Sequence, residues 1–351
     1  MTSPEEFGGP GAPKIGSVRR VRVSLSEEHL VRTSLLGSDR PLPLVVQPAI
    51  SGVGLLAWAE NHREFIANKL AEHGGMLFRD FGIKRVDEFE RLITITSDGE
   101  LMTYSYKSTP RSVVSGKIYT STEYPADQSI PLHNEMSYSR TWPMKAWFYC
   151  VRPAALGGQT PIADSRRVYE SIDPDIRDRF MRKKVQYVRN YGEGMDLRWQ
   201  DVFQTTDRAE VEEFCRQAGI QLQWKNGDRL RTRQLCQSVA RHPRTGQMVW
   251  FNQAHLFHIS SLEAPVGRML LEEFGEQDVP RNAFYGDGSP IEVTHLEAIR
   301  SVYQGQSVCF EWQEGDVLML DNMLVAHGRT PFEGTRRILV GLAEPLSSSG
   351  V

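Results

Sequence analysis

The chain has 351 residues, 40% of them hydrophobic, so it can bury one large core or two modest ones. The 41 Lys and Arg residues nearly balance the 44 Asp and Glu residues, and neither sign forms a long run. This argues against a nucleic-acid partner and favours a small-molecule substrate. The sequence starts without an apolar signal segment, and no later stretch approaches the ~18 apolar residues of a membrane helix. With four cysteines that lack CxxC spacing, these features predict a cytoplasmic protein without a membrane partner.

The first part of the chain changes character near residue 41. Residues 1–40 contain a glycine-rich start and a basic stretch without an apolar period, which predicts a flexible N-terminal arm. Apolar residues then recur at helical spacing over 55–70. Gly74 and Gly75 end this helix, and a strand at 76–81 and a short helix at 86–96 follow.

Beyond residue 100 the sequence is typical of many short strands. Runs rich in Val, Tyr, Phe and Trp alternate with turn residues. The predicted strands cover 145–151, 185–191, 248–252, 307–311, 317–320 and 337–342. Amphipathic spacing predicts helices at 165–184, 207–218, 261–275 and 292–303. The economical interpretation is a mainly β fold with helical insertions, in a single domain over 41–346 with a flexible tail at 347–351.

One short motif suggests a metal site. His133 and Glu135 are two residues apart in the run Ile130-Pro131-Leu132-His133-Asn134-Glu135. In an extended strand such residues point to the same side, so an imidazole and a carboxylate can meet at one point. Because a single pair of this kind is common by chance, a third ligand is required.

Among the other histidines, His327 has the surroundings that best suit a third metal ligand. It follows the apolar run 317–320 and the turn-like Asp321-Asn322. His255 and His258 are three residues apart but have no neighbouring carboxylate, which favours packing roles. Two histidines and one carboxylate form a facial triad that leaves coordination positions open, as iron(II) oxygenases require. Structural zinc sites prefer four ligands, and a zinc hydrolase would more often show HExxH, which is absent.

The motifs together resemble a known family. HNEMSY at 133–138, GGQTPIADS at 157–165, HGRTPF at 327–332 and GTRRIL at 334–339 resemble the taurine dioxygenase and clavaminate synthase superfamily of iron(II)/2-oxoglutarate oxygenases. Within it, the amino-acid hydroxylases of peptide natural-product pathways look most similar. The resemblance covers residues 42–345 and implies a double-stranded β-helix, a relative of the jelly roll.

The resemblance also implies roles for individual residues. His133, Glu135 and His327 match the iron ligands, while Thr160 and Arg337 match the pair that binds the distal carboxylate of 2-oxoglutarate. A planar guanidinium suits this role because it donates two parallel hydrogen bonds to a carboxylate. Arg336 is expected to point to the opposite side of the strand. Some relatives place the arginine later, where this chain has Gly341.

The implied reaction uses O2 and 2-oxoglutarate as co-substrates and releases succinate and CO2. Related halogenases replace the carboxylate ligand with a small residue, so Glu135 favours hydroxylation of a C–H bond. Desaturation, cyclisation and a non-catalytic metal-binding jelly roll stay open as alternatives.

The substrate is expected to be an amino acid or a derivative of one. The sequence does not distinguish a free amino acid from a peptide or from an aminoacyl group on a carrier protein. Polar residues expected near the open face of the metal could recognise it, although each also has a structural interpretation. These candidates are Tyr104, Ser121, Asn134, Arg140, Asn252, Gln253 and Arg329.

Overall fold

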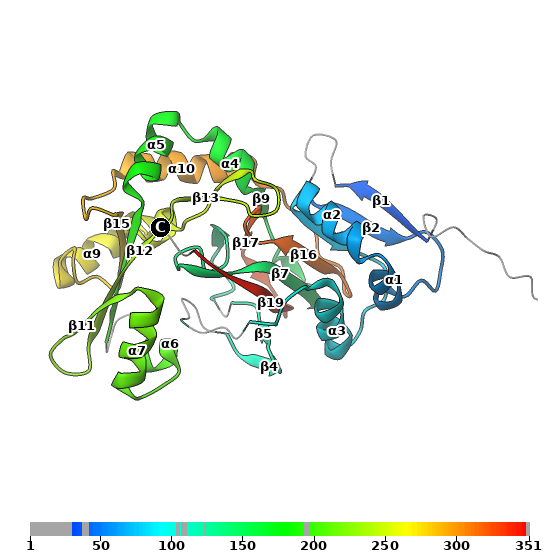
Figure 1. Ribbon diagram of the computed structural model, residues 1–351, viewed down its shortest axis with the longest axis horizontal. Helices are drawn as coiled ribbons and strands as arrows, with labels where there is room; N and C mark the ends of the chain where they lie inside the picture. The colour runs from blue at the N-terminus through cyan, green and yellow to red at the C-terminus, as the bar shows by residue number, and fades with distance from the viewer. Residues whose placement is uncertain are drawn as a thin grey trace, which may run out of the picture.

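The computed structural model describes residues 30–36, 42–102, 106, 111–122, 124–192 and 197–348. Among these, strands outnumber helices and form the centre of the molecule (Figure 1). The helices are α1 (Leu55–Asn61), α2 (Arg63–His73), α3 (Val86–Thr96), α4 (Ser165–Ser171), α5 (Pro174–Lys183), α6 (Trp199–Phe203), α7 (Arg208–Ala218), α8 (Ala254–Phe257), α9 (Ala264–Phe274) and α10 (Val293–Gln306). None of the helices in the described part of the chain is long and apolar enough to cross a membrane.

A large sheet of eight strands runs through the molecule. Its order is β1-β2-β3-β16-β7-β19-β5-β4. The strands are β1 (Val31–Leu35), β2 (Leu44–Pro48), β3 (Gly75–Phe78), β4 (Val113–Ser115), β5 (Ile118–Thr120), β7 (Thr141–Arg152), β16 (Val317–Asp321) and β19 (Arg337–Ser347). All pairs are antiparallel except β2 with β3.

Strands β7, β16 and β19 are buried on both faces, and their side chains alternate between two cores. Trp147 on β7 and Leu339 on β19 belong to the core under α1, α2 and α3. Phe148 and Ile338, one residue away in each strand, belong to the larger core on the other face. This follows from the two-residue period of a strand. Helices α1, α2 and α3 therefore cover the face of the sheet that is opposite to the larger core.

A three-stranded sheet packs on that other face. Its order is β6-β17-β9, formed by β6 (Ile130–His133), β17 (Val325–Arg329) and β9 (Ile162–Asp164). Leu132, Ile162 and Ala326 from these strands join the larger core. The two sheets enclose a common interior, as expected for a double-stranded β-helix. The mainly β prediction with helical insertions is confirmed.

The segment between β9 and β16 forms a separate layer beside the two sheets. It carries helices α4 to α10 and the sheet β11-β12-β10-β15 (Figure 1). These strands are β10 (Val185–Tyr191), β11 (Gln221–Trp224), β12 (Leu230–Cys236) and β15 (Arg281–Tyr285). Two short pairs complete the fold, β13 (Val239–Arg241) with β14 (Met248–Trp250) and β8 (Leu156–Gly157) with β18 (Phe332–Glu333).

Four local expectations differ from the structure. The predicted helix over 165–184 is two helices, α4 and α5, separated by Ile172 and Asp173. The predicted helix over 55–70 is two helices that meet at His62, whose backbone is not helical. Val31–Leu35, expected within a flexible arm, pair with β2 although most of their side chains are exposed, because backbone hydrogen bonds hold the strand and Val31 packs against the core. The predicted strand over 307–311 is only an isolated bridge between Val308 and Ile162.

Candidate metal centre

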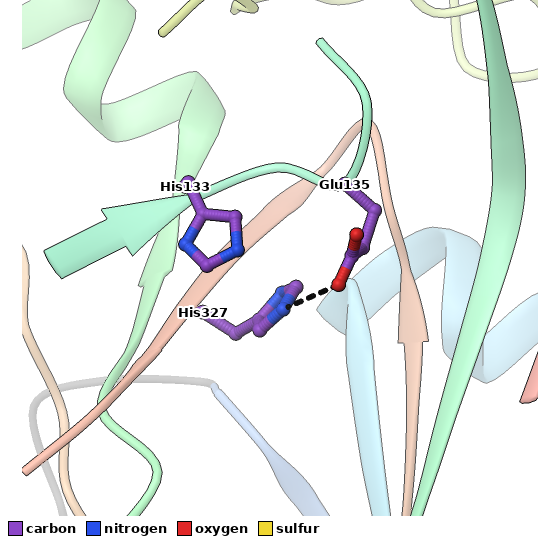
Figure 2. Close-up of side chains that lie close together, drawn as sticks. All are labelled: His133, Glu135 and His327. Atoms are coloured by element: carbon purple, nitrogen blue, oxygen red, sulfur yellow. Dashed lines mark ion pairs between the residues drawn. The ribbon is translucent and has the colours of Figure 1, made fainter. Parts of the chain in front are cut away.

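Three side chains meet at the end of the three-stranded sheet. His133 is the last residue of β6, Glu135 lies in the turn that follows, and His327 lies on β17, where it pairs with His133 (Figure 2). Their ligand atoms lie within 4.8 Å of one another, and Glu135 Oε1 is 3.4 Å from His327 Nε2. The expected strand alternation therefore does not apply, since Glu135 reaches the site from a turn.

The backbone of that turn is fixed by Asn322. This residue is fully buried. Its Oδ1 accepts from the Glu135 N–H at 2.7 Å, and its Nδ2 donates to the carbonyls of Glu135 at 2.9 Å and Pro143 at 2.7 Å. Asn134 Nδ2 in turn donates to the Asn322 carbonyl at 2.7 Å. The side-chain amides of Asn134 and Asn322 thus fix the position of Glu135 relative to β7 and the start of β17.

Asn322→Asp should destabilise the protein by roughly 1–3 kcal/mol. The substitution turns a donor into an acceptor that faces the carbonyls of Glu135 and Pro143. Urea unfolding measures the stability, and Mn(II) titration measures the effect on the metal centre, where we expect weaker binding. Unchanged stability together with unchanged affinity would show that Asn322 does not hold the turn.

His133 is in the state that a metal requires. His133 Nδ1 lies 2.8 Å from the Pro131 carbonyl, and a proton on Nδ1 leaves the Nε2 lone pair available for a metal ion. Burial, and next the nearby His327, lower the pKa of His133 to about 4. The imidazole is therefore neutral at neutral pH.

Glu135 forms a buried ion pair with Arg111. Nη2 of the guanidinium donates to Oε1, the same oxygen that faces His327, and each side chain is only 3% exposed. Burial alone would raise the pKa of Glu135, but Arg111 and the hydrogen bond with His327 outweigh it and hold the pKa below its ordinary value. The donor set of two imidazoles and one carboxylate fits an iron(II) ion.

A small cavity opens beside these groups. The described residues that line it include three arginines and no acidic residue: Arg111, Ser121, Thr122, Ile130, His133, Phe148, Thr160, His327, Gly328, Arg329, Arg336 and Ile338. The ring of Phe148 packs against His327 with 4.8 Å between the ring centroids. The excess of positive charge suits anionic ligands.

Arg336 and Thr160 both line the cavity. Arg336 Nε donates to the Gly158 carbonyl at 2.9 Å, and Thr160 Oγ1 accepts from Trp312 Nε1 at 3.0 Å. Burial, and next the charge of Arg329, lower the pKa of Arg336 to about 10, so it is charged at neutral pH. Arg337 is exposed and does not line the cavity. The arginine in reach of a ligand is thus the neighbour of the one that the sequence favoured.

The layer between β9 and β16 contacts the turn that follows His133. Gln237 Nε2 donates to the carbonyls of Ser137 at 2.9 Å and Ser139 at 3.2 Å. Gln253 Nε2 donates to the Asn134 carbonyl at 2.7 Å. The inserted layer thus helps to hold the backbone that carries Glu135.

Comparison with known proteins decides the family. The family model described as "Taurine catabolism dioxygenase TauD, TfdA family" matches residues 38–343. The chain belongs to the TauD/TfdA family. It is an iron(II)- and 2-oxoglutarate-dependent dioxygenase. The enzyme class and the cofactors predicted from the sequence are confirmed.

Relatives match along nearly the whole chain. The dapdiamide synthesis protein DdaC of Enterobacter agglomerans is 43% identical over 92% of this chain and 97% of its own length. A clavaminate synthase-like protein of Arabidopsis thaliana is 29% identical, with 87% and 94% covered. A structure of PvcB, an Fe, alpha-ketoglutarate dependent oxygenase from an isonitrile synthetic pathway, shares the fold with a TM-score of 0.54. It is 17% identical, with 94% of this chain and 98% of that chain covered.

Most substrate candidates of this TauD/TfdA chain hold the fold together instead of lining the cavity. Asn252 Nδ2 donates to the Ser238 carbonyl at 2.7 Å, and Arg140 Nε donates to the Leu235 carbonyl at 2.9 Å. Asn134 and Gln253 are used in the contacts described above. Tyr104 lies outside the described residues.

Two candidates do line the cavity. Ser121 is one, and its backbone N–H donates to the Ile338 carbonyl at 2.9 Å. Arg329 is the other, but its guanidinium donates to the carbonyls of Tyr124, Pro125 and Gln128 at 2.6 to 3.0 Å. Ser121 therefore remains the better candidate for contact with substrate.

Sequence reasoning missed Arg111, Asn322 and Phe148. Arg111 belongs to no motif and precedes Glu135 by 24 positions in the chain, so only the fold brings the two together. Asn322 was noted as part of a turn, and its buried amide contacts could not be inferred from that. Phe148 was placed correctly in a strand, but the side facing the metal centre was not evident.

Proposed function

We propose that this dioxygenase hydroxylates an unactivated C–H bond of an amino acid or amino-acid derivative. Substrate C–H, O2 and 2-oxoglutarate would give C–OH, succinate and CO2. The observation that carries the proposal is the cluster of His133, Glu135 and His327 beside a cavity lined by arginines and by no acidic residue among the described positions. When bound, iron supplies the activation of O2 and of the C–H bond.

Each group of residues around the cavity has its own proposed role. His133, Glu135 and His327 hold the metal. Arg336 and Thr160 bind the distal carboxylate of 2-oxoglutarate, since a partly buried guanidinium and a hydroxyl both line the cavity. Phe148 and Ile338 cover the centre with apolar surface and keep water away.

Two observations support this reaction and substrate class. Glu135 is retained at the position where related halogenases have a small residue, which favours transfer of oxygen over transfer of halide. The similar protein DdaC is described as a dapdiamide synthesis protein and PvcB as part of an isonitrile synthetic pathway. We therefore propose a role in biosynthesis of an amino-acid-derived natural product, with the substrate free or held on a carrier protein.

A cytoplasmic location is part of the proposal. Four cysteines are free: Cys150, Cys215 and Cys236 are buried and Cys309 is exposed. Free thiols are typical of a reducing compartment.

Succinate release measured across a panel of substrates tests the proposed reaction. The panel contains free amino acids, aminoacyl thioesters on a carrier protein and short peptides, each with iron(II), ascorbate and 2-oxoglutarate. We expect one class to raise succinate release at least tenfold over the uncoupled rate, with one oxygen atom gained in the product by mass spectrometry. Loss of two hydrogen atoms instead would indicate desaturation or cyclisation. No turnover with any substrate would favour a metal-binding protein without catalysis.

A further inference from the structure

Glu135 is a proposed metal ligand that also forms an ion pair with a buried arginine. Its Oε1 accepts a hydrogen bond from Arg111 Nη2 and also faces His327 Nε2 at 3.4 Å. Arg111 is held in this place, since Nη2 also lies 3.4 Å from Thr122 Oγ1 and the side chain is 3% exposed. A metal ion bound by Glu135 and the two histidines would thus share a carboxylate with a buried guanidinium.

The guanidinium of Arg111 and a metal ion bound to the same buried carboxylate would repel each other strongly. Both charges are poorly screened, because the Arg111 and Glu135 side chains are each only 3% exposed. The repulsion opposes binding of a divalent cation alone. An anion that enters the same cavity is attracted by both charges, and Arg329 and Arg336 increase this attraction because no acidic residue among the described lining offsets them.

We infer that Arg111 makes binding of the metal and binding of the dicarboxylate co-substrate depend on each other. The inference rests on the proposed assignment of the metal ligands. Arg111 weakens metal binding to the empty cavity and strengthens binding of the anion to the metal-loaded cavity. By thermodynamic linkage, the anion must then increase metal affinity by the same factor by which the metal increases anion affinity. Arg111 acts through charge, as a positioning residue that need not touch the substrate.

Mn(II) titrations of the whole protein, with and without N-oxalylglycine, test the inference without turnover. The variants are Arg111→Met, which removes charge and hydrogen bond, Arg111→Gln, which keeps a donor, and Arg111→Lys, which keeps the charge. Arg140→Met is the matched control, since Arg140 is an arginine outside the cavity that donates to a backbone carbonyl. Circular dichroism checks that each variant is folded.

We expect Mn(II) alone to bind Arg111→Met and Arg111→Gln at least tenfold more tightly than wild type. The gain in Mn(II) affinity on adding N-oxalylglycine should shrink by a similar factor in both, while Arg111→Lys and Arg140→Met behave as wild type. Unchanged or weaker Mn(II) binding by the Met and Gln variants would overturn the inference. So would wild-type behaviour of Arg111→Gln alone, which would assign the effect to the hydrogen bond.

The design separates this inference from the metal assignment. If His327→Ala bound Mn(II) as tightly as wild type, the ligand assignment itself would fail. If His327→Ala lost binding and the Arg111 variants showed no shift, only the role of Arg111 would be wrong.

Discussion

His133→Ala and His327→Ala should each abolish substrate-dependent succinate release and weaken Mn(II) binding by more than a hundredfold. Either change leaves one imidazole and one carboxylate, too few groups to hold a metal against water. Both histidines line a cavity, so the fold should survive, with an urea midpoint close to that of wild type. Isothermal titration with Mn(II) and an assay of succinate measure the two effects. His295→Ala provides a histidine control, because His295 pairs with Glu292 outside the cluster.

Glu135 needs a different substitution. Removing its carboxylate leaves the buried Arg111 without its ion-pair partner, which costs about 3–5 kcal/mol in comparable cases. Glu135→Ala would therefore confuse loss of the metal ligand with loss of stability. Glu135→Gln keeps the shape and an acceptor for Arg111, so lost activity in a folded Gln variant identifies the ligand. Wild-type turnover by any of the three variants would remove that residue from the metal site.

Arg336→Ala should weaken 2-oxoglutarate binding by roughly 2–5 kcal/mol, the range for truncating one partner of a buried charge pair. The KM for 2-oxoglutarate should rise by a factor of about thirty or more, since each 1.4 kcal/mol is tenfold. Arg337→Ala is the matched control, and its exposed side chain predicts little change. Binding of 2-oxoglutarate to the Mn(II)-loaded protein gives the direct measurement. A strong effect of Arg337→Ala with a silent Arg336→Ala would return the co-substrate role to Arg337.

The sequence did not reveal which of the neighbouring Arg336 and Arg337 lines the cavity. The motif placed an arginine at the head of β19, and strand alternation allowed only one of the two to face inward. The pairing of β19 with β7 is irregular between Arg337 and Ile338, and a shift of one residue exchanges the two faces. Residue types could not reveal this irregularity, because it depends on how the strand enters the sheet.

The other residues of the metal centre also fall into two groups, those that the sequence suggested and those that it did not. The ligand candidates His133, Glu135 and His327 were found from local spacing and a family resemblance, and strands β7, β10 and β16 from runs of apolar residues. Contacts that join distant segments, such as the Arg111 to Glu135 ion pair and the amide of Asn322, carry no local pattern. Substrate candidates were the weakest expectation, because a buried polar residue such as Asn252 can hold a turn as easily as bind a ligand.

The contacts from the inserted layer to the metal turn have a consequence for protein engineering. Gln237 and Gln253 donate to the backbone on either side of Glu135. The segment between β9 and β16 is therefore not an interchangeable module. A chimera that imports this segment from a relative to change substrate preference must keep glutamines at both positions, or the new segment will alter the metal ligand along with the selectivity. A library directed at Ser121, which lines the cavity and lies outside this segment, avoids this coupling.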